Sequence, residues 1–193
     1  MDRLNDDAFV VLNALYLRKM ADAGTLAENS GASLPAVAAA MAAALAAEGV
    51  LDLGGQYLLT DAGRAAVLEY YDRTYRDLRA APEVTEFYEK FESTVNQRFL
   101  ELVSAYQVDP ADKTVDRIIK TVERHTGALD EAAKWMERYG HYAERFRRSL
   151  ERFEDGQSEY LTSPTVDSLH NIWFEFHEDI LAVIGRPRET VEG

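Results

Sequence analysis

Two adjacent glycines, Gly54 and Gly55, constrain the fold of this chain more than any other feature of its sequence. They separate two short apolar runs, residues 50–53 and 56–59. A two-residue hairpin turn requires residues that tolerate positive φ, and glycine does so without steric cost. The pattern predicts a two-stranded β-hairpin, whereas the sequence on both sides of it has the periodicity of helices.

Two helical segments are expected before residue 31. Asn5 or Asp6 can cap the first, and Gly24 is expected to end it. The second begins at a capping box in residues 25–28, where the Thr hydroxyl and the Glu carboxylate satisfy backbone donors of the first turn. Gly31 is expected to end this segment.

A third helix is expected before the hairpin and a fourth after it. Ser33 and Pro35 are typical of a helix start, and Gly49 is expected to end the third helix. Its buried stripe is expected to consist of Val37, Met41 and Leu45. Thr60 is expected to cap the fourth helix, which continues toward Leu78.

Four segments carry a resemblance to known proteins: residues 25–28 (TLAE), 33–37 (SLPAV), 45–51 (LAAEGVL) and 57–64 (YLLTDAGR). Over about the first 75 residues the chain resembles bacterial winged-helix regulators of the multiple-antibiotic-resistance type. It resembles equally the winged-helix dimerisation unit of small-molecule O-methyltransferases. The LTDAGR run after the hairpin is the most specific part. No glycine-rich nucleotide motif follows a strand downstream, so a methyltransferase catalytic domain is not expected.

Beyond Ala81 and Pro82 the chain is expected to be entirely helical, because the residue before proline disfavours helical geometry and only helical stripes follow. The apolar stripes lie within residues 87–106, 115–122, 129–136, 142–153 and 169–184. Five amphipathic helices indicate an antiparallel bundle. The expected fold is mainly α, with a winged helix-turn-helix domain in residues 1–80 and a helical bundle domain in residues 83–193.

The chain is strongly acidic, with 21 Lys and Arg against 34 Asp and Glu and a formal net charge of −13. Up to Glu69 it has four basic and nine acidic residues, and the remainder has 17 basic and 25 acidic residues, so neither part is basic. This charge repels nucleic acid at long range. Cysteine is absent, which excludes disulfides and thiolate metal sites. Without a secretory signal or an apolar run of roughly 18 to 20 residues, a cytoplasmic protein with no membrane partner is expected.

The third helix would read DNA in a winged-helix regulator, but its sequence is unsuited to that role. Direct readout requires Arg, Lys, Asn or Gln, and residues 34–47 contain no charged side chain and no amide. The outward positions are Ala36, Ala39, Ala43 and Ala46. Small side chains allow close approach of another helix, which predicts an interaction face; the alternative is a solvated alanine-rich helix.

Two basic stripes are predicted on helices of the bundle. The first consists of Lys113, Arg117, Lys120 and Arg124, and the second of Arg138, Arg145, Arg148 and Arg152. Each set recurs at helical spacing, so it lies on one helix face. Either stripe is a candidate surface for an anionic ligand or an acidic partner. Solvated pairs at i,i+4 spacing, such as Asp116 with Lys120, are the alternative.

The last helix contains a candidate ligand pocket formed by His170, Trp173, Phe174 and His177. The two histidines are two turns apart, about 10 Å, which is too far for one metal ion. The alternative is two histidines hydrogen-bonded beside an aromatic core. We expect no metal, cofactor or catalytic residues, because no nucleophile elbow or phosphate loop is present, and therefore no enzyme.

These patterns favour a winged-helix regulator-like protein that acts mainly through protein association, as a homodimer or with a protein partner. One alternative is a DNA-binding transcriptional regulator with a ligand-sensing or dimerising bundle. Another is an accessory subunit of a separately encoded enzyme. DNA binding is disfavoured by the acidic chain and the alanine-rich third helix.

Overall fold

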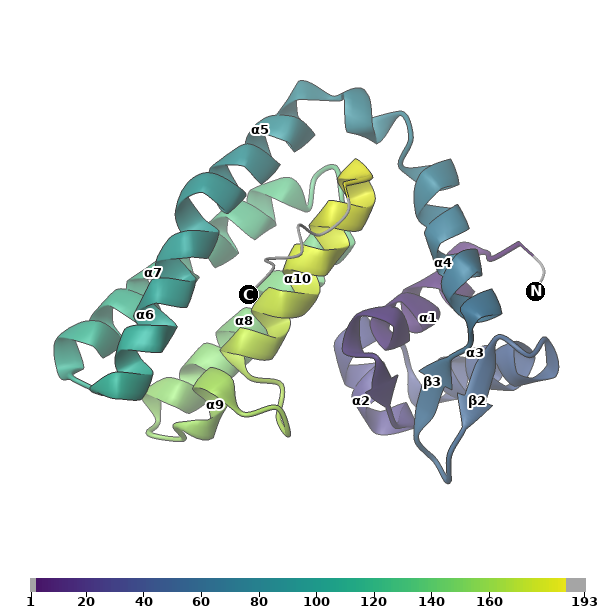
Figure 1. Cartoon of the computed structure of the whole chain (residues 1–193), viewed down its shortest axis with the longest axis horizontal. Helices are drawn as coiled ribbons and strands as arrows, with labels where there is room; N and C mark the ends of the chain where they lie inside the picture. The colour runs from purple at the N-terminus through teal and green to yellow at the C-terminus, as the bar shows by residue number, and fades with distance from the viewer. Residues whose placement is uncertain (1–2, 187–193) are drawn as a thin grey trace. The chain divides into compact units, whose positions relative to one another are not determined.

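The computed structural model describes residues 3–186 and is mainly helical, with one small antiparallel sheet (Figure 1). One compact unit holds the described residues up to Ala80 together with those from Glu178 on, and the other holds Ala81–His177. The elements of the first unit are α1 (Asp6–Arg18), β1 (Met20–Ala21), α2 (Ala23–Ser30), α3 (Leu34–Ala46), β2 (Val50–Asp52), β3 (Tyr57–Leu59), α4 (Asp61–Thr74) and η1 (Leu78–Ala80). Helix α10 (Leu169–Ile184) contributes to both units, so the predicted domain of residues 83–193 is divided at residue 178.

The first two helices differ from prediction at their junction. Asn5 caps α1 as expected, because its side chain accepts a hydrogen bond from Ala8 N at 2.8 Å. The cap of α2 is Asp22, whose carboxylate accepts from Thr25 N at 2.8 Å. The predicted capping box at Thr25 is therefore wrong. Gly24 lies in the first turn of α2 and does not end α1.

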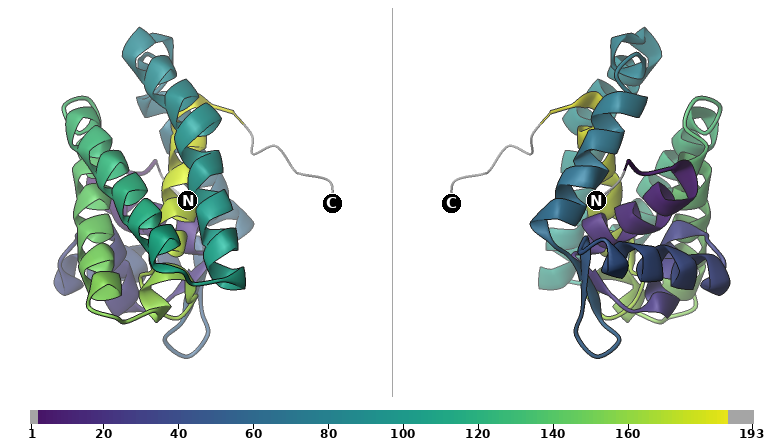
Figure 2. Two further views of the ribbon diagram at one scale, coloured as in Figure 1. Left: turned by 90° about the vertical axis from the view of Figure 1, so that its left-hand side faces the viewer. Right: turned by 90° about the vertical axis from the view of Figure 1, so that its right-hand side faces the viewer.

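The sheet has three strands in the order β1-β3-β2, one more than predicted. Strand β1 was missed because two residues, Met20 and Ala21, are too short to show an alternating pattern. The β2–β3 hairpin is confirmed: Gly54 and Gly55 have φ of 73° and 93°, and Leu53 N donates to Gln56 O at 2.8 Å. The hairpin projects from the helices of its unit (Figures 1 and 2).

The LTDAGR segment joins the hairpin to α4 through backbone contacts. Thr60 caps α4, and its hydroxyl, which accepts from Gly63 N, also donates to Glu48 O at 2.8 Å. A Cβ at Gly63 would lie 2.0 Å from the carbonyl oxygen of Gly49. No larger residue fits this approach, so Gly63 is required where α4 begins against the end of α3.

The core of the first unit is aromatic and contains a buried polar contact. Phe9 stacks on Tyr70 with ring centroids 3.7 Å apart and meets Tyr71 edge-on at 5.1 Å. The Tyr71 hydroxyl donates to Asp179 Oδ1 at 2.8 Å and lies 2.7 Å from Asn13 Oδ1. All three polar side chains are buried, so this contact satisfies groups that would otherwise be costly to desolvate.

The second unit is built from helices alone. Its elements are α5 (Pro82–Lys90), the π-helical segment η2 (Phe91–Asn96), α6 (Gln97–Val108), α7 (Asp112–Ala132), α8 (Arg138–Glu154), α9 (Glu159–Thr162) and the first part of α10. Two predicted stripes, residues 115–122 and 129–136, fall largely within the single helix α7, because nothing between them breaks the helix. Helix α7 packs against both α6 and α8 (Figures 1 and 2).

Candidate functional site

Helix α3 presents an exposed face without charge. Ser33 caps it as predicted, with its hydroxyl accepting from Ala36 N, and Val37, Met41 and Ala44 are buried. Leu45 is half-buried, so the predicted buried stripe is shifted toward Ala44. The four alanines of the predicted interaction face are all exposed: Ala36, Ala39, Ala43 and Ala46. We call these four residues the alanine face.

Apolar side chains are also exposed elsewhere in the first unit. Leu34, at the start of α3, is 58% exposed, and the hairpin exposes Leu51 and Leu53 by 49% and 60%. Scattered exposed leucines are ordinary on protein surfaces. Here they accompany a helix whose accessible side contains no group that could bind a phosphate or a base edge.

The cations of this unit lie outside α3 and the hairpin. Lys19 Nζ is 4.8 Å from the ring centroid of Tyr16, and the Arg64 guanidinium is 5.6 Å from the same ring. Burial is the main cause that raises the pKa of the Tyr16 hydroxyl, so this ring stays neutral at physiological pH. These cations bind an aromatic face of α1 and add no basic group to the alanine face.

The two predicted basic stripes have different outcomes. On α7, Lys113, Arg117, Lys120 and Arg124 are all exposed. On α8, Arg148 and Arg152 are exposed and Arg138 is half-buried, whereas Arg145 is only 1% exposed. The prediction that Arg145 belongs to an accessible stripe is wrong, because it lies one turn from the buried Tyr142 and Ser149 on the inner face of α8.

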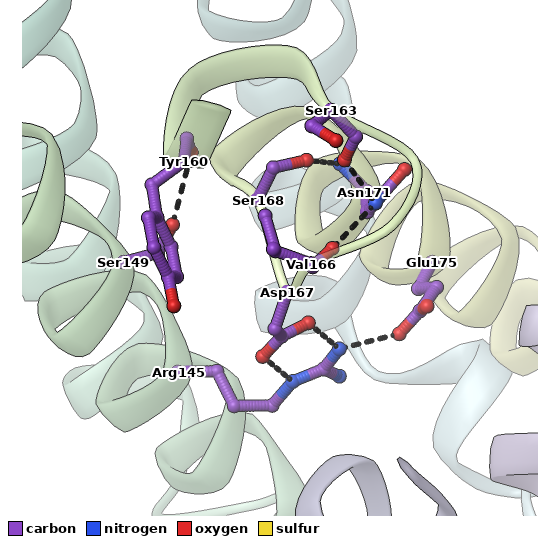
Figure 3. Close-up of polar contacts among 9 residues, drawn as sticks. All are labelled: Arg145, Ser149, Tyr160, Ser163, Val166, Asp167, Ser168, Asn171 and Glu175. Carbon is purple, nitrogen blue, oxygen red and sulfur yellow. Dashed lines mark hydrogen bonds and ion pairs between the residues drawn. The ribbon is translucent and has the colours of Figure 1, made fainter. Parts of the chain in front are cut away.

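Arg145 is the centre of a buried ion-pair cluster (Figure 3). Its Nε and Nη2 donate to the two carboxylate oxygens of Asp167 at 3.0 and 2.7 Å, and Nη2 also donates to Glu175 Oε2 at 2.6 Å. The two carboxylates outweigh the cost of burying the guanidinium and raise the pKa of Arg145 above its usual range. With Nε and Nη2 engaged and the side chain 1% exposed, Arg145 is unavailable to an external ligand.

The same cluster fixes the segment between α9 and α10. The Asn171 side-chain amide donates to the carbonyls of Ser163 and Val166 at 2.9 and 2.8 Å, and Ser168 Oγ accepts from Asn171 N (Figure 3). Asp167 lies between these residues and is held by Arg145. The contacts therefore have a structural role: they close a polar loop against α8.

The residues of the predicted ligand pocket on α10 have different environments. Trp173 is 2% exposed, stacks on Phe99 at 3.9 Å and donates from Nε1 to Asn96 Oδ1 at 2.9 Å. His177 Nε2 lies 2.8 Å from Glu92 Oε2. His170 and Phe174 are half-buried, and burial lowers the pKa of His170. The ring centroid of His177 lies 5.6 Å from that of Phe91, so this histidine is beside the aromatic core as the alternative interpretation expects.

A third histidine, His125 on α7, was not singled out from the sequence. Its ring lies 4.7 to 5.4 Å from four aromatic rings, those of Phe91, Phe146, Trp173 and Phe176. Within residues 3–186 its Nε2 has no hydrogen-bond partner. Desolvation lowers its pKa to about 3, so the imidazole is neutral at physiological pH. Its spacing from Val122 and Leu129 places it on the apolar stripe of α7. This spacing is the sequence signal from which a buried histidine could have been predicted.

We expect His125 to make the protein less stable in acid. Below its ordinary pKa near 6.5 the unfolded chain binds a proton that folded His125 excludes, so stability falls as the pH decreases from about 6 to 4. Relative to His125→Leu, wild type should lose up to about 1.4 kcal/mol per pH unit in urea unfolding. His170→Gln is the control and should retain most of this dependence. Parallel curves for wild type and His125→Leu would contradict it.

No family model, curated protein or solved structure matches the chain. Among residues 3–186, no single helix is long and apolar enough to span a membrane; the pair α2 and α3, bent by 114°, meets that test only when counted together. Within the same residues, no group of three or more His, Asp and Glu side chains could hold a metal ion.

Proposed function

We propose that the chain is a regulator-like winged-helix protein that acts through protein association, with a second copy of itself as the partner at the alanine face. Its order of three helices, a hairpin and a fourth helix, together with the third strand, is that expected of a winged helix. No chemistry in the described residues requires a catalytic role.

The observation that carries the proposal is the exposure of the alanine face. Four alanines separated by three or four residues are accessible on one helix, and no charged or amide side chain interrupts them. Such a face permits close approach of another helix, with small side chains filling the contact. It offers nothing to a phosphate or a base edge, which argues against reading DNA through α3.

The charge of the chain favours this face for self-association. Two copies that each carry −13 repel each other where their carboxylates meet. The accessible side of α3 has no carboxylate of its own. Contact through it therefore places no carboxylate of one α3 helix against a carboxylate of the other.

Ala43→Arg tests this proposal. A long charged side chain at a close helix contact should weaken self-association by at least about tenfold, because the guanidinium would be desolvated without a partner. Sedimentation equilibrium measures the effect. Ala65→Arg is the matched control: Ala65 is an exposed alanine of α4 in the same unit, and its substitution changes the net charge equally. Its association should remain at the wild-type value.

The transcriptional-regulator alternative is tested on the same samples. Screening against randomised duplex DNA at physiological salt should give no nanomolar binding, whereas specific readers typically bind at about 10⁻⁸ to 10⁻¹¹ M. Nanomolar binding to a selected duplex, together with unchanged association of Ala43→Arg, would refute the proposal in favour of DNA reading. A monomeric wild type at micromolar concentration would refute self-association.

A further inference from the structure

The second unit contains a small pocket between the π-helical segment and α7, separate from the alanine face. Its volume is about 140 Å³. The pocket is lined by Thr94, Val95, Arg98, Lys120, Thr121 and Arg124. Three of these six side chains are cationic and none is acidic, in a chain where acidic residues outnumber basic ones. The lining is therefore positively charged, opposite in sign to the net charge of the chain.

None of the three cations has an ion-pair partner in the part of the chain that the structure describes. Within residues 3–186, Arg98, Lys120 and Arg124 make no ion pair or side-chain hydrogen bond, although Asp116 is placed at i,i+4 spacing to Lys120. The alternative interpretation, that the stripe consists of solvated i,i+4 pairs, is therefore not supported for Lys120 and Arg124. Three unpaired cations that line one pocket can bind an anion that enters it.

Only two of the four residues of the predicted α7 stripe line this pocket. Lys120 and Arg124, one turn apart on α7, line it, whereas Lys113 and Arg117 of the same stripe do not. Arg98 reaches the pocket from α6, the helix that packs against α7. Convergence from two helices distinguishes this pocket from a single solvated helix face, and no single-helix periodicity could have predicted it.

The backbone beside the pocket is unusual. Thr94 and Val95 belong to η2, a π-helical segment of six residues. Such segments are rare and occur frequently at functional sites. Here the other side of the same segment is held to α10, because Asn96 accepts from Trp173 and Glu92 contacts His177. These contacts fix η2, and with it the position of Thr94 at the pocket.

We infer that this pocket binds a phosphate group, either as inorganic phosphate or as the terminal group of a soluble phosphomonoester. A cavity of roughly 150 Å³ accommodates benzene, so 140 Å³ suits a group of phosphate size. A phosphate carries about −1.5 to −2 at neutral pH, which three cations can compensate. Arg98 and Arg124 can each donate two parallel hydrogen bonds, and Lys120 supplies a point charge. The Thr94 hydroxyl lies 3.4 Å from Ser93 Oγ. The Thr121 hydroxyl already donates to Arg117 O at 2.7 Å.

The acidity of the chain does not prevent this binding. Charges farther away than the Debye length, about 8 Å at physiological ionic strength, are largely screened. The local lining then determines the affinity. A long polyanion would extend beyond the pocket over a chain whose net charge is −13, so the site favours a small anion over nucleic acid.

Titration calorimetry of the full chain with sodium phosphate, against sodium chloride at equal ionic strength, tests the inference. Wild type should bind phosphate saturably with a Kd of about 1 mM or tighter. Arg98→Gln and Arg124→Gln should each weaken binding by about tenfold, since each removes a charge-assisted donor pair. Lys113→Gln and Arg117→Gln are matched controls from the α7 stripe and should change Kd less than about twofold.

A titration with phosphoserine distinguishes the two sources: tighter binding than phosphate assigns the site to a phosphomonoester, and equal binding assigns it to free phosphate.

The substituted side chains are exposed, so the variants should melt as wild type does in circular dichroism. If one of them fails to fold, the other, on a different helix, carries the same test. The inference is overturned if wild type shows no saturable heat, or if Lys113→Gln weakens binding as much as Arg124→Gln. The second result would mean that the ion is attracted diffusely along the stripe.

Discussion

Replacing Trp173 by alanine should lower the free energy of unfolding of the second unit by about 3 to 5 kcal/mol. The indole is 2% exposed and stacks on Phe99 at 3.9 Å, so its removal leaves a large cavity. It also leaves the side chain of Asn96 without the donor it has at 2.9 Å. A buried acceptor without a partner adds a further cost to the lost apolar contact.

Urea unfolding measures this effect, with the fluorescence of Trp135, the other tryptophan of the chain, as the reporter. Both tryptophans lie in the second unit, so the signal reports on the unfolding of that unit. Trp135→Ala, read through Trp173, is the control. Trp135 is half-buried and should cost less. A loss below about 1 kcal/mol for Trp173→Ala would show that the indole is not a core side chain.

Arg145→Met should have an effect of similar size, about 3 to 5 kcal/mol, because it removes one partner of a buried ion pair. The variant leaves the carboxylates of Asp167 and Glu175 in the interior without their cation, at positions 12% and 3% exposed. Arg148→Met is the control on the same helix. Arg148 is exposed, and its substitution should change stability by no more than about 0.5 kcal/mol.

A triple variant separates lost pairing from lost packing. If the loss of the Arg145 cation from the two carboxylates causes the destabilisation, adding Asp167→Asn and Glu175→Gln to Arg145→Met should recover a large part of the stability, since neutral amides are less costly to bury. The measurement is again urea unfolding. No recovery would mean that the arginine stabilises α8 mainly through its aliphatic packing.

Local signals in the sequence predicted most of the helices of the first unit and its hairpin. Asn5, Ser33 and Thr60 cap helices as expected, because a cap is a contact within three residues. The Gly54-Gly55 turn is equally local. Strand β1 was missed because its identity depends on pairing with Leu58 and Tyr57, far along the chain. The cap of α2 was predicted at Thr25 and is Asp22. Both residue types can cap a helix, and the two positions are only three residues apart.

Side-chain roles in the second unit were less predictable, because they depend on which helices face each other. The spacing of Arg145 fits both a basic stripe and the buried face of α8; only Asp167 and Glu175 on neighbouring segments decide between them. Arg98 was not selected at all, since its importance comes from Lys120 and Arg124 on another helix. His125, by contrast, could have been found as the one ionisable member of the α7 apolar stripe.

The close approach of Gly63 to the carbonyl of Gly49 shows which position of the LTDAGR motif the backbone constrains. Position 63 accepts no side chain, whereas the preceding residue of the motif, Ala62, is exposed. The glycine of the motif is therefore required by the close approach of two backbone segments. The outward residues of α3 can be replaced without disturbing this contact, so the motif constrains the scaffold and does not specify the molecule that the scaffold recognises.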